Sequence, residues 1–232
     1  PPRSDRGELA CQTEDAIWAT PLVVGDRVYV AAMDHHVYSL DAETGEVLWK
    51  SQVGGAMAAP PTLIEKDGIL YVGAFDGQLY ALRIDSGERV EGFEFQASNW
   101  IWSKVLALGE QLFVTSLDGN LYALDPANGA VIWSYCGTSK EDNGQCKDTV
   151  LRASPIEAGG SIVIASEEGE VTSVLDSVRQ WNWPSGTPGA GILTTPVTSE
   201  DMVYLILMDG QVQALNADSG GQVWTFTPPE AD

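Results

Sequence analysis

Two basic residues and three tryptophans fall in one part of a repeated sequence pattern and could form a binding surface. The chain has only 12 Lys and Arg, yet Lys104 and Arg152 both lie in short segments that precede predicted inner strands. Trp18, Trp100 and Trp102 stand in equivalent segments. Such a group could hold an anion, an acidic peptide or a planar ligand. The alternative is structural: both cations pair with nearby carboxylates while the rings cover the ends of the repeated units.

These lead-in segments align on a proline. We align Pro21, Pro60, Pro155 and Pro196, so that Lys104 replaces the proline in the third copy. Three residues earlier stand Trp18, Met57, Ile101, Arg152 and Leu193. The alignment predicts that Lys104 and Arg152 occupy neighbouring columns at one end of the molecule.

Three cysteines offer redox chemistry. Cys136 and Cys146 bracket the polar stretch CGTSKEDNGQC, and a bridge between them would close a loop worth roughly 3 kcal/mol in the chain-entropy model. Two unpaired thiols are the alternative, but exposed free thiols are a liability. We therefore predict the disulfide and, with it, an oxidising, extracytoplasmic location in the periplasm or at the cell surface. Cys11 is then left over, either buried or paired outside the chain.

No residue pattern supports catalysis or metal binding. The sequence lacks HExxH, CxxC, GxSxG, phosphate-loop and EF-hand motifs. Of the two histidines in the sequence, His35 takes the turn position where glycine stands in other copies, and His tolerates a left-handed backbone. We interpret His35 and His36 as turn and surface residues rather than metal ligands. We predict no catalytic residue and no metal ligand, and enzymatic activity is the disfavoured interpretation.

The charge balance narrows the choice of partners. Asp and Glu number 33, and the formal net charge is −21. Such a surface repels phosphate backbones and anionic lipid, which disfavours nucleic acid and lipid headgroups as ligands. The sequence shows no run of apolar residues long enough to span a bilayer and no recognisable signal peptide, so we expect no direct membrane insertion.

The elements that position these residues come from an internal repeat. An Asp or Glu that opens a tight turn recurs about every forty residues, at Asp34, Asp76, Asp118, Glu168 and Asp209. Four short strand candidates surround each copy, and nothing has helical periodicity. A second turn ends in Gly45, Gly87, Gly129 or Gly220, and Trp49, Glu91, Trp133 or Trp224 follows four residues later.

A large ring at a fixed place on the outer strand suits the packing of one unit on the next. The fourth copy has a shorter second turn but still reaches Trp181. In the second copy Glu91 takes the tryptophan position, so we predict a weak seam there unless Phe93 or Phe95 fills the gap.

Four-stranded units of this length, none able to bury both faces alone, are propeller blades. The predicted fold is an all-β propeller of four-stranded antiparallel blades with five repeats, either a five-bladed ring or part of a larger propeller. We place the propeller over residues 16–232, with an inserted loop at 136–150. Residues 1–15 form an N-terminal segment and a candidate closing strand.

The phrase DGxLYALD, a turn and GxxxW resembles the repeat of the pyrroloquinoline-quinone-type propellers over roughly residues 16–229. That family includes quinoprotein dehydrogenases and the propeller lipoprotein of the outer-membrane β-barrel assembly machinery, and both groups have eight blades. The resemblance implies that an enzymatic member would hold its quinone with a vicinal disulfide, a stacking Trp and calcium. No two cysteines are adjacent here.

These observations predict a non-catalytic, extracytoplasmic propeller that binds or scaffolds protein partners, without a cofactor. Its contact surface would be the channel mouth, with Trp18, Trp100, Trp102, Lys104 and Arg152. One alternative is a quinoprotein-like ligand-binding or redox domain that uses the same mouth with pyrroloquinoline quinone and calcium. A second alternative is the sensor ectodomain of a larger receptor.

Overall fold

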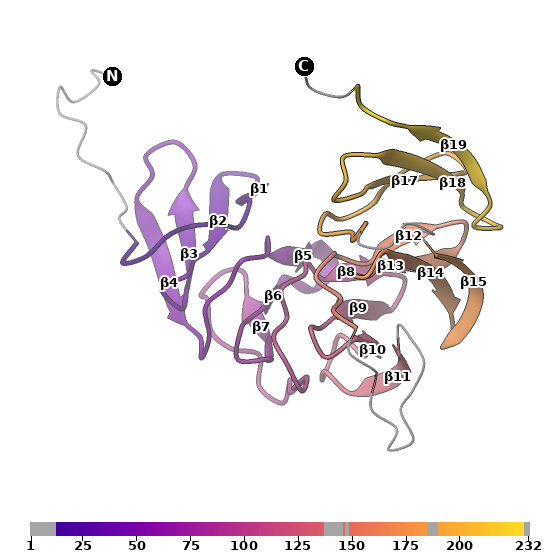
Figure 1. The fold of residues 1–232 in the computed structure, drawn as a ribbon. Coiled ribbons are helices and arrows are strands. Elements are labelled where there is room, and N and C mark those ends of the chain that lie inside the picture. The colour runs from indigo at the N-terminus through magenta and orange to yellow at the C-terminus, as the bar shows by residue number, and fades with distance from the viewer. Residues whose placement is uncertain (1–12, 137–145, 147–148, 185–189, 230–232) are drawn as a thin grey trace.

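The computed structural model describes residues 13–136, 146, 149–184 and 190–229. In these residues the chain folds into five antiparallel sheets that follow one another along an arc (Figure 1). The one helical element described is a short 3₁₀ turn, Glu65–Asp67, and no described helix is long and apolar enough to cross a membrane. The predicted all-β propeller architecture is confirmed. The candidate closing strand at residues 1–15 lies almost entirely outside the described residues.

Each blade is a meander of consecutive strands. The first blade comprises β1 (Leu22–Val24), β2 (Arg27–Ala31), β3 (His36–Asp41) and β4 (Val47–Gln52). The second has β5 (Thr62–Ile64), β6 (Ile69–Gly73) and β7 (Leu79–Arg83). The third has β8 (Leu106–Leu108), β9 (Gln111–Thr115), β10 (Asn120–Leu124) and β11 (Val131–Cys136). The fourth has β12 (Ile156–Ala158), β13 (Ser161–Ala165), β14 (Glu170–Leu175) and β15 (Val178–Pro184). The fifth has β16 (Val197–Ser199), β17 (Met202–Ile206), β18 (Val212–Asn216) and β19 (Gln222–Phe226).

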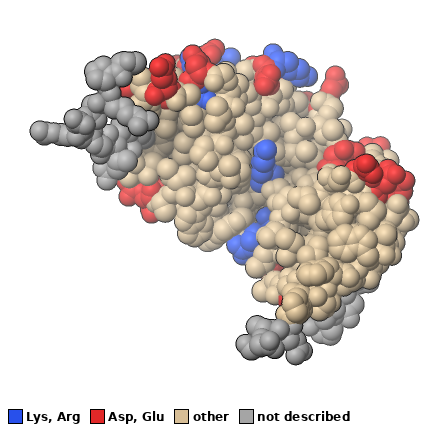
Figure 2. Space-filling view, turned by 90° about the horizontal axis from the view of Figure 1, so that it is seen from above, with Lys and Arg blue, Asp and Glu red and all other residues tan. Residues whose placement is uncertain are grey.

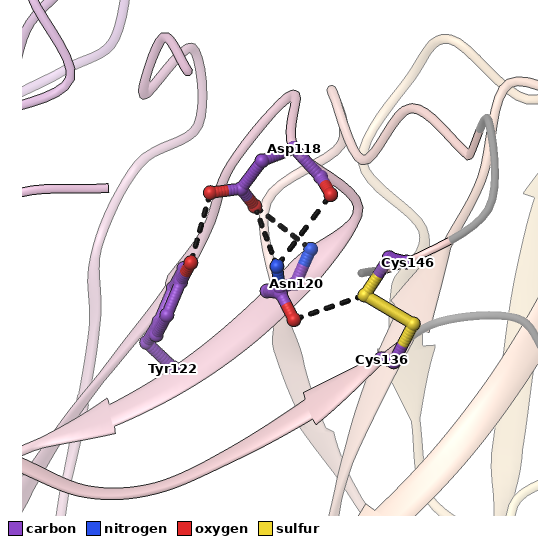
Figure 3. The surroundings of a disulfide bond; sticks show 5 residues. All are labelled: Asp118, Asn120, Tyr122, Cys136 and Cys146. Atoms are coloured by element: carbon purple, nitrogen blue, oxygen red, sulfur yellow. Dashed lines mark hydrogen bonds between the residues drawn. A yellow bond between two sulfur atoms is a disulfide. The ribbon is translucent and has the colours of Figure 1, made fainter. Parts of the chain in front are cut away.

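The aspartate of the repeated Asp-Gly phrase holds its turn together. In the third blade Asp118 accepts the amide of Asn120 at 3.0 Å and the hydroxyl of Tyr122 at 2.8 Å (Figure 3). The hydroxyls of Tyr38 and Tyr80 donate to Asp34 and Asp76 in the same way, each at 2.5 Å. The spacing of Asp and Tyr in the repeat is therefore a local hydrogen-bonding unit.

The left-handed turn positions agree with the residue types. His35 has φ 66°, so the predicted turn role of this histidine is confirmed. In the fourth blade the second turn shortens to Asp176 and Ser177, with φ 48° and 64°, between Leu175 and Val178. Positive φ at both central residues is the signature of a two-residue hairpin of the primed type, which explains how this copy manages without glycine.

Tryptophans join neighbouring blades. The Trp49 indole lies over Gly87 of the second blade, where a Cβ would come within 2.5 Å of the ring, and its Nε1 donates to the Ile84 carbonyl at 3.0 Å. Trp181 repeats this contact with Gly220 and the Ala217 carbonyl, at 2.5 Å and 2.8 Å. Glycine is thus required here for close approach as well as for its positive φ.

The second blade replaces the tryptophan with other groups. The Tyr71 hydroxyl donates to the Pro126 carbonyl at 2.8 Å, the position equivalent to Ile84 and Ala217. The Glu94 amide donates to Asn128 at 2.9 Å. Phe93 packs on Tyr71, and the buried Phe95 meets Tyr122 edge-on at 5.0 Å. Phe93 thus takes the place of the tryptophan ring beside the tyrosine, while the backbone of Glu94 lies over Gly129, where tryptophan rings lie in the other seams.

The outer segment of the second blade is irregular. Residues 89–96 pair with the facing strand only at two isolated bridges, Arg89 with Leu82 on β7 and Gln96 with Gln78 just before it. The bridge partners are seven residues apart on the outer segment and four apart on the facing segment. The surplus residues bulge away, so the regular sheet of this blade has three strands rather than the predicted four.

The predicted disulfide is present. Cys136 at the end of β11 is bonded to Cys146, ten residues later (Figure 3). The bridge lies beside the third-blade turn, where the Cys146 sulfur is 3.0 Å from the Asn120 side-chain oxygen. It therefore holds Cys146 at the same end of the blade as the Asp118 turn.

The five blades do not close on themselves. The first and fifth blades stand at opposite ends of the arc, with a gap between them (Figure 1). Of the two alternatives predicted, a five-bladed ring and part of a larger propeller, the closed five-bladed ring is not what this chain forms.

Candidate functional site

The lead-in segments and the Asp-Gly turns meet at one end of the propeller, which we call the mouth. The amide of Phe75, just before the Asp76 turn, donates to the Ala56 carbonyl at 2.9 Å. The amide of Leu117 donates to the Trp100 carbonyl at 2.9 Å. Corresponding bonds recur in every blade, so each lead-in segment is held against the turn that follows it.

The structure corrects the predicted proline column by one residue. Inner strands begin immediately after Pro21, Pro61, Val105, Pro155 and Pro196. Val105, not Lys104, therefore interrupts the column, and Lys104 is equivalent to Pro60 and Ser154. The sequence itself held the signal for this register, because Pro21, Val105, Pro155 and Pro196 each stand 13 residues before the residue that opens the following turn. Three residues before the corrected column stand Trp18, Ala58, Trp102, Arg152 and Leu193.

The corrected register places the predicted site residues next to one another. Trp18 and Trp102 approach to 6.0 Å between ring centroids, and the intervening position is the small Ala58. The Arg152 guanidinium lies 4.4 Å from the centre of the Trp102 ring. Three of the five predicted residues thus form a continuous contact around the mouth.

Phe75 joins Trp100 to this group. Its ring is stacked on Trp100 at 4.8 Å with an interplanar angle of 9°, and on Trp102 at 4.7 Å with an angle of 18°. We call Trp18, Phe75, Trp100, Trp102 and Arg152 the mouth cluster. Trp18 is 61% and Trp100 45% exposed, so the cluster shows large flat apolar surfaces to solvent.

Arg152 is neutralised within the protein. Its Nε donates to a carboxylate oxygen of Glu167, and both side chains are partly buried. The structural alternative considered from the sequence, pairing with a nearby carboxylate, therefore holds for this residue. The guanidinium therefore takes part in the site mainly by stacking on the Trp102 ring.

Lys104 lies apart from the cluster, in a groove along the inner strands. The groove encloses about 610 Å³, and its lining includes Pro60, Lys104, Ser154, Pro155, Glu157 and Thr195. The Lys104 amide donates to the Ser154 hydroxyl at 2.9 Å, and the Ser154 amide to the Thr195 hydroxyl at 3.1 Å. Among the described residues, no carboxylate lies within ion-pair distance of the Lys104 ammonium.

Charged side chains are distributed unevenly over the surface. Figure 2 shows basic side chains in the hollow between the two halves of the arc, while acidic side chains lie towards its outer parts together with further basic ones. The hollow is thus less negative than the surface around it, although the whole chain carries −21.

Phe75 and Glu167 were not predicted from the sequence. Both occupy the residue before a turn-opening Asp or Glu, a position that also holds Met33, Leu117 and Met208. This column is the one that bonds the lead-in segment, so its side chains necessarily border the mouth. A column-by-column comparison of all five copies would have found it.

The described residues do not fit the quinone site of enzymatic propellers. No group of three His, Cys, Asp or Glu side chains in this part of the chain could hold a metal ion. The two described cysteines form the Cys136–Cys146 bridge, which is not vicinal. Stacking surfaces are available at the mouth, but the described part of the chain brings no such group of three side chains beside them.

Comparison with known families gives a direct match. The family model described as outer membrane protein assembly factor BamB matches residues 7–99, 59–189 and 155–231. The chain belongs to this family. The overlapping matches cover all five blades.

Relatives of known name are similar over different lengths. BamB from Moranella endobia is 23% identical over 214 residues, 87% of this chain and 42% of the relative. BamB from Marinobacter adhaerens is 45% identical over 38 residues, 16% of this chain and 10% of the relative. Lupanine 17-hydroxylase [cytochrome c] from a Pseudomonas species is 46% identical over 44 residues, 19% of this chain and 6% of that protein. The chain thus spans less than half the length of each of these relatives.

Solved structures share the fold. BamB from Moraxella catarrhalis superposes with a TM-score of 0.76 at 20% identity, covering 92% of this chain and 65% of that one. The computationally designed Ika8 protein superposes with a TM-score of 0.74 at 16% identity, covering 92% and 62%. At these identities the likeness concerns the fold alone.

Proposed function

We propose that this chain is a non-catalytic, protein-binding propeller that works outside the cytoplasm as part of a larger assembly. Family membership supports a protein partner, because its relatives are named as assembly factors for outer membrane proteins. The Cys136–Cys146 bridge supports an oxidising compartment. We expect no cofactor to be needed for this role.

The mouth cluster is the contact surface of this proposal, and its stacked rings are the observation that carries it. Trp100, Phe75 and Trp102 are stacked in sequence, and the Arg152 guanidinium lies over the Trp102 ring. Rigid aromatic side chains supply contact area at little entropic cost, and Trp, Tyr and Arg dominate the energetics of protein interfaces. Rings already stacked in the free protein lose little freedom on binding.

The chemistry of the partner follows from the two parts of the site. Because Arg152 is paired with Glu167, the mouth cluster favours apolar or aromatic side chains. Lys104 has no ion-pair partner among the described residues and can receive a carboxylate in the adjoining groove. The expected ligand is a peptide segment that carries both aromatic and acidic residues.

Titration with a labelled synthetic peptide of alternating acidic and aromatic residues tests this proposal. Trp100→Ala should weaken binding about tenfold or more, because truncating an interface tryptophan removes a binding hot spot. Lys104→Ala should reduce mainly the salt dependence of binding, since it removes the unpaired cation. Trp224→Ala is the matched control, because Trp224 is similarly exposed, at 43%, but lies on the fifth blade away from the mouth.

Equal loss of peptide binding in Trp100→Ala and Trp224→Ala would show that the mouth cluster is not the contact surface. The quinoprotein alternative is tested with pyrroloquinoline quinone and calcium. Stoichiometric quinone binding that Trp100→Ala abolishes, with dehydrogenase activity on simple alcohols, would replace the proposal with the enzymatic one.

A further inference from the structure

The outer segment of the second blade leaves two backbone groups of β7 without the partners that a regular fourth strand would supply. The Leu79 amide donates to the Phe95 carbonyl at 3.3 Å. The Val90 amide donates to the Ala81 carbonyl at 2.9 Å. In an antiparallel ladder each of these pairs exchanges a second bond in return. Neither return bond is present among the described residues, and the Val90 carbonyl accepts the Phe93 amide at 3.4 Å instead. The Leu79 C=O and the Ala81 N–H are thus unpaired within the described chain.

These two groups lie beside a cavity that the bulge of the outer segment creates. The cavity encloses about 620 Å³ between residues 78–81 and residues 89–96. Leu79 and Ala81, which line it, are only 3% and 4% exposed, and buried backbone groups are nearly always hydrogen-bonded. Arg89, Glu94 and Gln96 also line the cavity and are exposed, so it opens to solvent. A ligand that enters it can pair with both groups.

The two isolated bridges of this blade limit what can pair there. One involves Leu82 and the other Gln78, so they stand on either side of the unpaired groups. A strand that continued past these groups would have to displace a bridge, and the cavity therefore suits the end of a chain rather than its middle. In a parallel pair, the N–H and C=O of one residue bond to the C=O of residue i and the N–H of residue i+2 on the neighbouring strand. The Leu79 C=O and the Ala81 N–H have this spacing, so they fit one terminal residue.

A cation at the cavity favours a carboxyl end. The Arg89 guanidinium lies 4.8 Å from the centre of the Tyr80 ring, and one of its nitrogens donates to the Gln52 carbonyl at 3.1 Å. Among the described residues, no carboxylate lies within ion-pair distance of this guanidinium. Its other N–H groups can bind a carboxylate in the forked geometry that guanidinium favours. Glu94 is the one carboxylate among the described lining residues, and water weakens its repulsion of an anion because its side chain is exposed.

We infer that this cavity, the blade-two pocket, binds the C-terminal residue of a peptide chain. The amide N–H of that residue donates to the Leu79 C=O. One carboxylate oxygen accepts the Ala81 N–H, and the other faces Arg89. The blade-two pocket shares no residue with the mouth cluster, so this inference holds or fails independently of the function proposed above.

Isothermal titration calorimetry with synthetic peptides tests the ligand class. N-acetyl-trialanine with a free carboxylate should bind. The same peptide with a C-terminal amide should bind at least about tenfold more weakly, because it lacks the charge that Arg89 receives. Equal binding of the acid and the amide, or no binding of the acid, overturns the proposal. N-acetyl-alanine has the same terminal groups and should bind less tightly than the tripeptide. Equal affinity for the two would overturn a peptide as the ligand and assign the site to N-acyl amino acids.

Charge variants test the residues of the pocket. Arg89→Gln should weaken binding of the free acid about tenfold or more, because it removes the partner of the carboxylate. Arg83→Gln is the matched control, since Arg83 is also exposed and on the second blade but does not line the pocket. Glu94→Gln should strengthen binding, a gain that misfolding cannot produce. Equal weakening by the two arginine variants, or no gain in Glu94→Gln, overturns the proposal.

The Ala81 amide reports the position of the ligand without any substitution at the pocket. In isotope-labelled protein saturated with N-acetyl-trialanine, hydrogen exchange of this amide should slow, because it gains an acceptor. The amide of Ala123 is the control, since this equivalent residue is already paired with Trp133 in the four-stranded sheet of the third blade. Trp100→Ala should leave the protection of Ala81 unchanged. Exchange at Ala81 that does not respond to saturating peptide places the ligand elsewhere and overturns the proposal.

Discussion

A tryptophan on the outer strand joins two blades only when the next blade offers both a glycine and a free carbonyl. Trp49 and Trp181 find both. Trp133 does not, because the second turn of the fourth blade is the shortened Asp176–Ser177 hairpin. Its buried Nε1 finds no acceptor in the part of the chain that the structure describes, although the ring packs on Phe113 at 5.8 Å.

This difference predicts that replacing tryptophan with phenylalanine lowers the free energy of unfolding by unequal amounts at the two positions Trp181 and Trp133. Trp181→Phe should cost about 1–3 kcal/mol of unfolding free energy beyond the packing change, because the buried Ala217 carbonyl loses its donor. Trp133→Phe should cost less, because it removes a buried donor that has no acceptor. Urea denaturation of both variants measures the comparison, and each is the other's control for loss of ring area. A larger loss for Trp133→Phe would contradict the seam geometry.

A second prediction at the residue scale concerns alkaline pH. Burial, together with the carboxylates of Asp67 and Asp125, raises the pKa of Tyr71 to about 12 from 10.0. A pKa raised in the folded state adds stability that is complete below pH 10.0 and is lost as pH rises towards 12. Tyr71→Phe should therefore flatten the decline of stability in this range, although it removes the Pro126 hydrogen bond and lowers stability at neutral pH. Denaturation at a series of pH values measures the slope, and a slope unchanged by the substitution would refute the assignment.

At the scale of elements, the second blade shows how a seam can be firm while the sheet beneath it is irregular. Tyr71, Phe93 and Phe95 secure the seam to the third blade. The outer segment of the same blade nevertheless bulges between its two isolated bridges. In this blade, packing against the next blade and hydrogen bonding within the sheet therefore contribute separately to stability.

Hydrogen exchange can separate them. The amides of Glu91, Gly92 and Phe95 should exchange faster than those of β4, β11 and β15, because they find no backbone acceptor among the described residues. Amides of β6 and β7 that bond to each other should stay protected, since the seam above them is packed. Uniform protection across the second blade would show that its outer strand pairs regularly in solution.

At the scale of the whole molecule, the large negative net charge affects stability. The net charge is −21, and the described residues contain one Arg–carboxylate pair and one His–Asp pair. Self-repulsion of a strongly acidic chain destabilises its compact state, and salt screens that repulsion. The acidic surface is compatible with a protein partner at the less negative hollow.

The melting temperature should therefore rise as sodium chloride increases from very low to physiological ionic strength. An uncharged osmolyte at matched osmolality is the control, because it leaves the Debye length unchanged. Calorimetry at a fixed, low protein concentration keeps self-association from adding to the effect. A melting temperature that falls over this range would show that attractive pairs outweigh the repulsion.

Local interactions explain what was predictable from the sequence. The Asp-Gly turn, the Asp–Tyr hydrogen bond and the alternation of each strand act within a few residues, so the repeat of Asp34, Asp76 and Asp118 predicts blades directly. The Cys136–Cys146 bridge closes a short loop, and His35 meets a backbone requirement of its own turn. Each of these features depends only on neighbours in the chain.

The sequence by itself determined the type of blade, the number of copies and the disulfide. Only the tertiary structure decided how blades meet: the stack of Phe75 between Trp100 and Trp102, the capture of Arg152 by Glu167, the missing acceptor for Trp133 and the open arc. These depend on side chains from different repeats that approach across a seam, where a register error of one residue changes every neighbour. The physical reason is that turns and strands are specified by local backbone preferences, whereas the contacts at the mouth and between blades are specified by packing over long sequence distances.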